Sequence, residues 1–507
     1  AQALAVTAAQ VSMPRRTRLG VAVAALVATT APAFGEQICA AGHAAELGSC
    51  RPPAETLLRW ASSRGAWVDR LVVTSVPKGQ DGMSVRGLAA SAMASMDEVL
   101  LRIPSDMWLN SSSAQLSKLP SLPDAARAVI SSARCDRFED RFAGCRVRLV
   151  AALLSLRATG GDWSGYFHHL PSLRDFQRFH PMLADETLLN SFGGLPAVRK
   201  LAWQQHKIWK RFENFLELGG NATAEDWIWG EVVAQTRSWR DPSTGYGELL
   251  VPVLDSMNTD LSARVNVAMR VRADDKVGAE AVATRAIGTG EELVIGVGIN
   301  GMSNADLARN WGFTLPDNPT PLDSLPAPAC RELAEATRAA SFEQCSCSVP
   351  NAPANQSATF CTFARLALEH CKALRVDAGA SGCVPASLRR TEAAAGATKA
   401  VASPEAPLAF FRNALEESVR LYWLPNGAKA VDLGIIPSRG VKPVQTTLGH
   451  TFAAIGVEAA ARQSAADVAA AVAGEASAAV EAFDFKASRA FHFFRIERRT
   501  SPSQAKV

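Results

Sequence analysis

Large apolar residues recur at every second position from Val265 to Val271, which predicts a half-buried β-strand. Short apolar runs bounded by glycine or proline predict further strands at 71–73, 82–90, 98–104 and 248–254. From about residue 125 to residue 239 the spacing of apolar positions changes to three and four residues, as in the run from Leu149 to Leu156, and this spacing predicts helices. A helical insertion therefore interrupts a β-rich region.

Prolines cluster between Pro316 and Pro328, and such a cluster is typical of a link between domains. We place a domain boundary near residue 325. The region that follows is expected to be mainly helical, partly because residues 458–482 are nearly all alanine. The sequence thus predicts an α+β protein with a leader at 1–50, a β-rich domain at 51–325 carrying a helical insertion at about 125–239, and a mainly α-helical C-terminal domain at 326–507.

The bulk composition fits a chain of two to four domains, since 48% of the 507 residues are apolar and 20% are charged. Basic and acidic residues number 53 and 49 and are well mixed, so no basic stripe points to nucleic acid. The segment 13–33 resembles an export signal, with arginines, a short apolar run and Ala31-Pro32-Ala33; an alanine-rich leader is the alternative. Its apolar run is too short to span a bilayer, which takes roughly 20 residues, and no transmembrane span is expected.

Two interpretations compete for the stretch from Glu291 to Pro319. Gly296, Gly298 and Gly301 spell G-x-G-x-x-G between an apolar strand and a helix, which is the layout of a dinucleotide-binding turn. That interpretation needs a second parallel strand after the helix, and the proline-rich exit disfavours one. The helix itself is explained by capping, with Ser303 at its start and Gly312 at its end.

Four separated segments carry the second interpretation. The first runs from Arg86-Gly87-Leu88 to Pro104, and the second holds Trp163, Tyr166 and Pro171, followed by Thr236-Arg237-Ser238-Trp239. The third is 250–259, LVPVLDSMNT, and the fourth joins Glu291-Glu292 to Ser303-Asn304-Ala305-Asp306-Leu307 and Trp311-Gly312-Phe313. Together, over residues 65–320, they resemble the SET-domain methyltransferases, in the branch that includes the Rubisco large-subunit lysine methyltransferase and the actin-histidine methyltransferase.

The resemblance implies S-adenosylmethionine as cofactor, a protein as substrate and a side-chain nitrogen, of lysine above all, as methyl acceptor. It also implies cofactor contacts from the backbone at Gly87 and Leu88, from Arg237 to the cofactor carboxylate, from Asn258, and from Trp311 near the adenine. Structural alternatives exist for four of these residues: Gly87 could form a turn, Arg237 could be a surface helix residue, Asn258 could close an Asx-turn, and Trp311 could be a core residue. The region after residue 325 would then dock the substrate, and we expect a monomer.

The active site departs from the family at more than one position. The family has a tyrosine directly after the Glu-Glu strand, where this chain has Val297. The family also has a histidine after the asparagine that matches Asn258, where this chain has Thr259. Valine cannot donate a hydrogen bond, so the catalytic residue is left unassigned, with Tyr246 as a weak candidate. A degenerate SET module that binds without turnover is the second hypothesis, and an NAD-linked oxidoreductase is the third.

The cysteines suggest no metal centre. Cys345, Cys347, Cys361, Cys371 and Cys383 match no regular zinc spacing, and disulfides or buried thiols are favoured. An even count of ten cysteines and three glycosylation sequons lean towards an oxidising compartment. The cofactor that the resemblance implies suits a plastid or the cytosol, so we favour a plastid and keep the secretory pathway as the alternative.

Overall fold

The computed structural model describes residues 55–77, 84–114, 116–137, 141–241, 244–245, 247–260, 264–271, 278–296, 301–315, 318–320, 322–323, 325, 330, 333, 357–371, 408–424, 430–446, 450–457, 481–484 and 491–496. The predicted leader at 1–50 lies outside these residues. The boundary near residue 325 stays a prediction.

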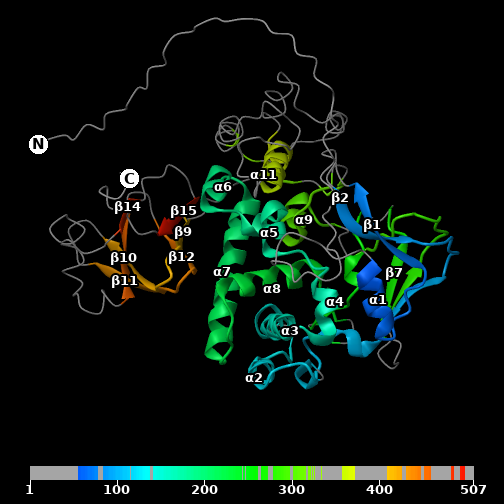
Figure 1. The fold of residues 1–507 in the computed structure, drawn as a ribbon. Helices are drawn as coiled ribbons and strands as arrows, with labels where there is room; N and C mark the ends of the chain where they lie inside the picture. Colours follow the sequence, from blue (N-terminus) through cyan, green and yellow to red (C-terminus); the bar gives the residue numbers. More distant parts are fainter. Residues whose placement is uncertain are drawn as a thin grey trace, which may run out of the picture. The chain divides into compact units, whose positions relative to one another are not determined.

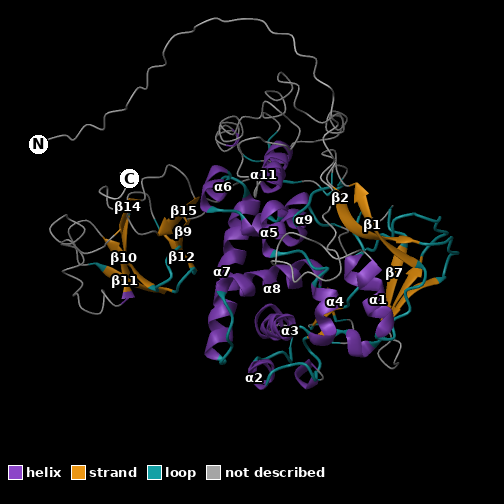
Figure 2. Cartoon of the chain, in the orientation of Figure 1, coloured by secondary structure: helices purple, strands orange, loops and turns teal. Residues whose placement is uncertain are grey.

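Short antiparallel sheets make up the β-rich part (Figures 1 and 2). Strands β1 (Leu71–Pro77) and β2 (Ser84–Ala90) form a two-stranded sheet. A second sheet has β8 (Ala279–Ala283) between β3 (Val99–Ile103) and β7 (Val267–Val271), and a third has β6 (Glu248–Leu250) between β4 (Leu109–Asn110) and β5 (Trp239–Arg240). The strands predicted at 71–73, 82–90, 98–104 and 265–271 are confirmed to within a few residues at their ends. The strand predicted at 248–254 ends at Leu250, because Pro252 has no amide donor and Val253 has a φ of 68°, and the 3-10 turn η7 (Leu254–Ser256) follows.

The predicted helical insertion is confirmed between β4 and β5, where the helices are purple in Figure 2. Its helices are α2 (Asp124–Ser132), α3 (Arg146–Thr159), α4 (Ser164–Phe167), α5 (Leu173–Phe179), α6 (Glu186–Ser191), α7 (Pro196–Glu217) and α8 (Ala224–Arg237); α1 (Glu55–Ser63) precedes β1. Helix α7 buries Leu201, Gln205, Ile208, Phe212 and other residues at three- and four-residue spacing, which is the apolar face of an amphipathic helix. Thr223 caps α8, since its hydroxyl accepts a hydrogen bond from Asp226 N at 3.1 Å.

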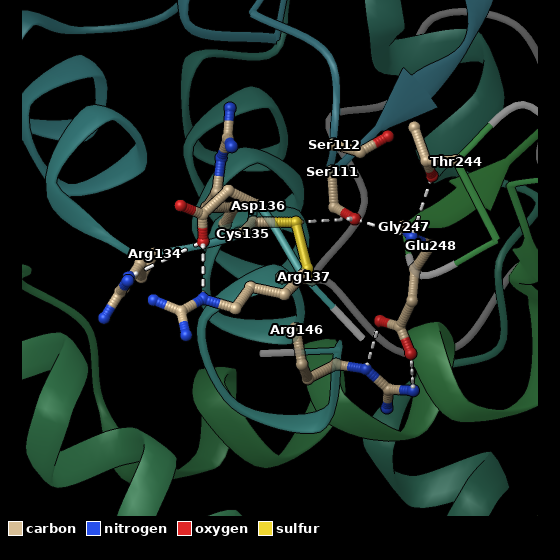
Figure 3. Close-up of a disulfide and its surroundings, with 12 residues drawn as sticks. Ser111, Ser112, Arg134, Cys135, Asp136, Arg137, Arg146, Thr244, Gly247 and Glu248 are labelled. Atoms are coloured by element: carbon tan, nitrogen blue, oxygen red, sulfur yellow. Dashed lines mark hydrogen bonds and ion pairs between the residues drawn. A yellow bond between two sulfur atoms is a disulfide. The ribbon is translucent and has the colours of Figure 1, made fainter. Parts of the chain in front are cut away.

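A buried ionic network ties the insertion to the β-rich part (Figure 3). Arg146 of α3 pairs with Glu248 of β6 at 2.5 Å and with Glu231 of α8 at 3.5 Å. Beside it, the disulfide between Cys135 and Cys145 joins the segment after α2 to the turn before α3. Burial opposes the charge on Arg146, but the two carboxylates outweigh it and raise the pKa of the guanidinium.

The expectation of a mainly helical C-terminal region is wrong for the described residues from 408 onward, although the α+β class is confirmed. They form β9 (Leu408–Asn413), β10 (Val419–Leu424), β11 (Val431–Ile436), β12 (Val441–Gln445), β13 (Thr451–Gly456), β14 (Glu481–Asp484) and β15 (Phe491–Ile496), in sheets ordered β11-β10-β13-β14 and β12-β9-β15. Short runs of aromatic and β-branched residues between turns outweigh the alanine content. Of the alanine-rich stretch, residues 458–480 lie outside the described ranges.

Further helices are described between these parts of the sequence. Helix α9 (Asn304–Trp311) begins and ends as predicted, because the Ser303 hydroxyl accepts from Asp306 N at 3.3 Å and Gly312 adopts the left-handed conformation at φ 82°. Helix α11 (Ser357–His370) ends beside a disulfide between Cys330 and Cys371. Within the described chain, no helix is both long and apolar enough to cross a membrane.

Candidate functional site

The candidate site is built on a close contact between Gly87 and Asn258. Gly87 is buried in β2, and a methyl group on its Cα would lie 2.6 Å from Asn258 Nδ2. That Nδ2 donates a hydrogen bond to Glu292 Oε1 at 2.7 Å. Glycine is therefore required at this position because a side-chain amide lies against the backbone. Three segments far apart in the sequence meet here.

The peptide group between Val294 and Ile295 fixes how these segments cross. Its carbonyl accepts hydrogen bonds from the amides of Asn266 and Val267, each at 3.1 Å, while its N–H donates to the carbonyl of Asn258 at 3.0 Å. The carbonyl and the N–H of a trans peptide group point in opposite directions. The segment at 294–295 therefore lies between the two ends of the stretch that joins Asn258 to Val267.

Asn266 holds this crossing together. Its side-chain oxygen accepts from Val294 N at 2.8 Å, and its Nδ2 donates to Glu292 O at 2.9 Å and to Glu291 Oε1 at 3.1 Å. Only 1% of the residue is exposed. Because its side-chain oxygen and both amide hydrogens are engaged within the protein and the residue is buried, we assign Asn266 a structural role.

A second polar group lies where α8 ends. Arg237 Nη1 donates to the backbone oxygen of Asp255 at 3.0 Å and lies 3.4 Å from Asp255 Oδ2. The Tyr166 hydroxyl donates to that same Oδ2 at 2.7 Å. Asp255 belongs to η7, which lies beside β2, so this group adjoins the strand that carries Gly87.

Burial dominates the electrostatics of this group. It raises the pKa of the Asp255 carboxyl, against the opposing effect of Arg237, and it raises the pKa of the Tyr166 phenol well above its usual value. The phenol therefore stays a hydrogen-bond donor at ordinary pH. Arg237 Nε is buried and has no hydrogen-bond partner among the described residues. An unsatisfied donor of this kind is a suitable place for an acceptor supplied by a ligand.

A histidine contacts the residue before Gly87. Arg86 Nη1 donates to His169 O at 3.1 Å and lies 3.0 Å from His169 Nδ1. An arginine can only donate, so Nδ1 is the acceptor and the proton of the neutral imidazole is on Nε2. Burial, followed by the charges of Arg86 and His168, lowers the pKa of His169 to about 3, and its Nε2 is buried without a partner.

The other predicted cofactor residues have different surroundings. The side chain of Leu88 is fully buried in the core, and its carbonyl accepts from Leu293 N at 2.8 Å. Trp311 is half-buried at the end of α9. A hydrogen bond of 3.3 Å from Gln235 to Asn310 joins the last turns of α8 and α9, which brings Trp311 near the helix end that carries Arg237.

Of the three positions discussed above for catalysis, the structure describes Thr259. Val297 and Tyr246 lie outside the described residues. Thr259, at the family's histidine position, lies next to Asn258, and its buried hydroxyl has no hydrogen-bond partner in the described part of the chain. Sequence reasoning did not single out Asp255, although it lies inside the quoted LVPVLDSMNT segment, because nothing local indicates that an arginine and a tyrosine converge on it.

The dinucleotide interpretation finds no support in the segment after α9. Residues 312–315 and 318–320 form no strand, and Leu315 turns back to exchange hydrogen bonds of 2.9 Å with the side chain of Asn304 at the helix start. A βαβ unit needs a parallel strand after its helix. Among the described residues no cluster of three or more His, Cys, Asp or Glu could hold a metal, and Cys371 is paired with Cys330.

Solved structures similar to this chain are SET domains. The SET domain of LSMT bound to lysine and AdoHcy matches over 65% of this chain and 90% of that one, with 15% identity and a TM-score of 0.43. The same domain bound to MeLysine and AdoHcy matches over 52% of this chain, with 19% identity and a TM-score of 0.40, and the match spans 57% of that chain's length. No protein-family model and no curated protein matches the sequence.

Proposed function

We propose that this chain is an S-adenosylmethionine-dependent protein methyltransferase of SET type, which transfers a methyl group to a lysine side-chain nitrogen. The observation that carries the proposal is the crossing of segments at Asn258, packed against Gly87 of β2. Three of the four motifs, which occur in the family's order, supply the residues that meet there: Gly87, Asn258 and Glu292. The crossing places backbone and amide groups around one small region, as a site that must position two reactants requires.

The described residues fit such a cofactor. Arg237 has a buried Nε without a partner in the protein, which suits a carboxylate, and Thr259 offers a buried hydroxyl. The absence of a side chain at Gly87 lets Asn258, a proposed cofactor contact, lie against the backbone of β2. In this proposal Arg237 faces the cofactor carboxylate, Asn258 and the backbone at Gly87 and Leu88 hold its middle, and Trp311 lies near its adenine.

The bound cofactor supplies an activated methyl group on a sulfonium, and the protein must present a neutral lysine nitrogen in line with it. Most of the rate comes from holding the two in place. Val297 offers no hydroxyl to orient that nitrogen, and losing one positioned polar group commonly costs about two or more powers of ten in rate. We therefore propose a slow enzyme, whose substrate is docked by the region after residue 325.

Calorimetric titration of the purified chain with S-adenosylmethionine, S-adenosylhomocysteine and NAD tests the cofactor. We expect heat with the first two and none with NAD. In Asn258→Ala the binding should weaken at least tenfold, whereas Gly288→Ala, in an exposed turn, should bind like the wild type. Absence of heat with both sulfur ligands would refute the proposal, and heat with NAD alone would favour the oxidoreductase.

Methyl transfer from labelled cofactor to proteins of a cell extract tests turnover. Wild type and Val297→Tyr are compared, since the variant supplies the phenol that the family uses. We expect label transfer by both, faster in the variant. Transfer by the variant alone would favour the second hypothesis, a degenerate SET module that binds without turnover, for which the valine at this position is the specific observation.

A further inference from the structure

Tyr166 is a buried phenol whose single polar atom points at the candidate site. Its ring is held by neighbouring aromatic side chains, stacked on Trp60 with centroids 5.8 Å apart and edge-on to Trp163 at 6.2 Å. The residue is 1% exposed, so the hydroxyl must find a partner inside the protein. That partner is Asp255 Oδ2, at 2.7 Å.

The two contacts to Asp255 Oδ2 differ in length. The Tyr166 hydroxyl is at ordinary hydrogen-bond distance, whereas Arg237 Nη1 is 3.4 Å away and makes its shorter bond, 3.0 Å, to the backbone oxygen of Asp255. Arginine and a carboxylate usually pair through two parallel short bonds when nothing prevents it. Here that pairing is absent, and Arg237 Nε is left without a partner.

We infer that Tyr166 is a positioning residue: by holding Asp255 Oδ2 it keeps that carboxylate from pairing fully with Arg237, and so keeps the guanidinium available for the carboxylate of the cofactor. The inference rests on the proposed function. Without the phenol, the Asp255 carboxylate would turn towards the cation beside it and occupy the donors that a ligand needs. Burial keeps the phenol protonated, so it donates throughout the working pH range.

Tyr166→Phe removes the hydroxyl and keeps the ring that packs on Trp60. Two ligands are titrated into each protein by calorimetry: S-adenosylmethionine and its decarboxylated form, which differs from it only by the carboxylate. We expect the variant to bind S-adenosylmethionine about tenfold more weakly and the decarboxylated ligand within about twofold of the wild type. Tyr422→Phe, a buried tyrosine of β10, is the matched control and should change neither.

Equal weakening of both ligands, or no weakening of either, overturns the inference and leaves the cofactor proposal standing. Failure of the wild type to bind S-adenosylmethionine overturns both. The inference therefore requires that the loss of affinity is confined to the ligand that has a carboxylate. A purely structural role of the Tyr166 hydroxyl would weaken both ligands alike.

Asp255→Asn provides a second test, which also serves if Tyr166→Phe fails to fold. The substitution removes the negative charge that competes with the ligand, while the backbone oxygen that holds Arg237 at 3.0 Å remains. We expect the preference for S-adenosylmethionine over the decarboxylated ligand to rise at least threefold. A fall in that preference would overturn the inference.

Discussion

Replacing Gly87 by alanine tests the contact on which the candidate site is built. The new methyl group would lie 2.6 Å from Asn258 Nδ2 and 3.3 Å from Val76 Cγ2. The glycine backbone is not in the left-handed region, so the conformation itself accepts alanine and the effect comes from the contact. The amide of Asn258 must move away and give up its 2.7 Å hydrogen bond to Glu292.

The magnitude results from two opposing effects. Losing a hydrogen bond to a charged acceptor costs about 1.5–3 kcal/mol. Exchanging glycine for alanine stabilises by about 0.4–1 kcal/mol, because the unfolded chain loses conformational freedom. We therefore expect Gly87→Ala to lower the free energy of unfolding by about 1–2 kcal/mol.

Gly288→Ala is the matched control, since the nearest atom to its new methyl group is Glu291 Oε2 at 3.7 Å, an ordinary van der Waals contact. It should leave stability unchanged or raise it by up to about 1 kcal/mol. Urea unfolding followed by circular dichroism gives both values, and calorimetry with S-adenosylhomocysteine gives the affinity, which should fall in Gly87→Ala only. If Gly87→Ala is as stable as Gly288→Ala and binds equally well, the close packing of Gly87 on Asn258 is refuted.

Two further predictions concern buried ionisable side chains. Glu248→Gln leaves Arg146 without its principal partner and should lower the free energy of unfolding by about 3–5 kcal/mol. Glu55→Gln, in an exposed ion pair, is the control and should lower it by less than about 1 kcal/mol in the same urea assay. Equal losses in the two variants would contradict a buried ionic network around Arg146. The pKa of His169 is depressed to about 3 in the folded chain, so the unfolded chain takes up a proton near pH 6.5 that the folded chain does not. The stability that comes from keeping His169 neutral is therefore present above pH 6.5 and is lost as the pH falls below it. Between pH 6 and 5 the wild type should lose about 1 kcal/mol more than His169→Gln, and parallel pH curves would contradict a neutral buried histidine.

The elements that could be predicted are those whose cause is local. Helix α9 has its cap at Ser303 and its left-handed end at Gly312 within ten residues of each other, and β7 carries its own alternation. Such signals need no knowledge of the rest of the chain. The alanine content between 458 and 482 does not predict the structure of the strands after residue 408, since runs such as Val419–Leu424 have strand composition of their own.

The candidate site could be predicted only in part, because its contacts join distant positions. Tyr166 and Asp255 are separated by 89 residues, and Asn258 and Glu292 by 34. Motifs in family order identified the segments, but no pattern in the sequence states which side chains converge. That the Arg237 guanidinium shares Asp255 with a buried phenol depends on how α4, which carries Tyr166, packs on α1 outside the insertion.

The two asparagines at the crossing show how structural and binding residues can be separated. Asn266 engages its side-chain oxygen and both amide hydrogens within the protein and is almost fully buried, so it is poorly placed to bind a ligand. Asn258 uses its Nδ2 for Glu292, and its Oδ1 takes part in no hydrogen bond among the described residues. Both sit on the same pair of crossing segments, and this difference in hydrogen bonding is the reason why we propose Asn258, and not Asn266, as the cofactor contact.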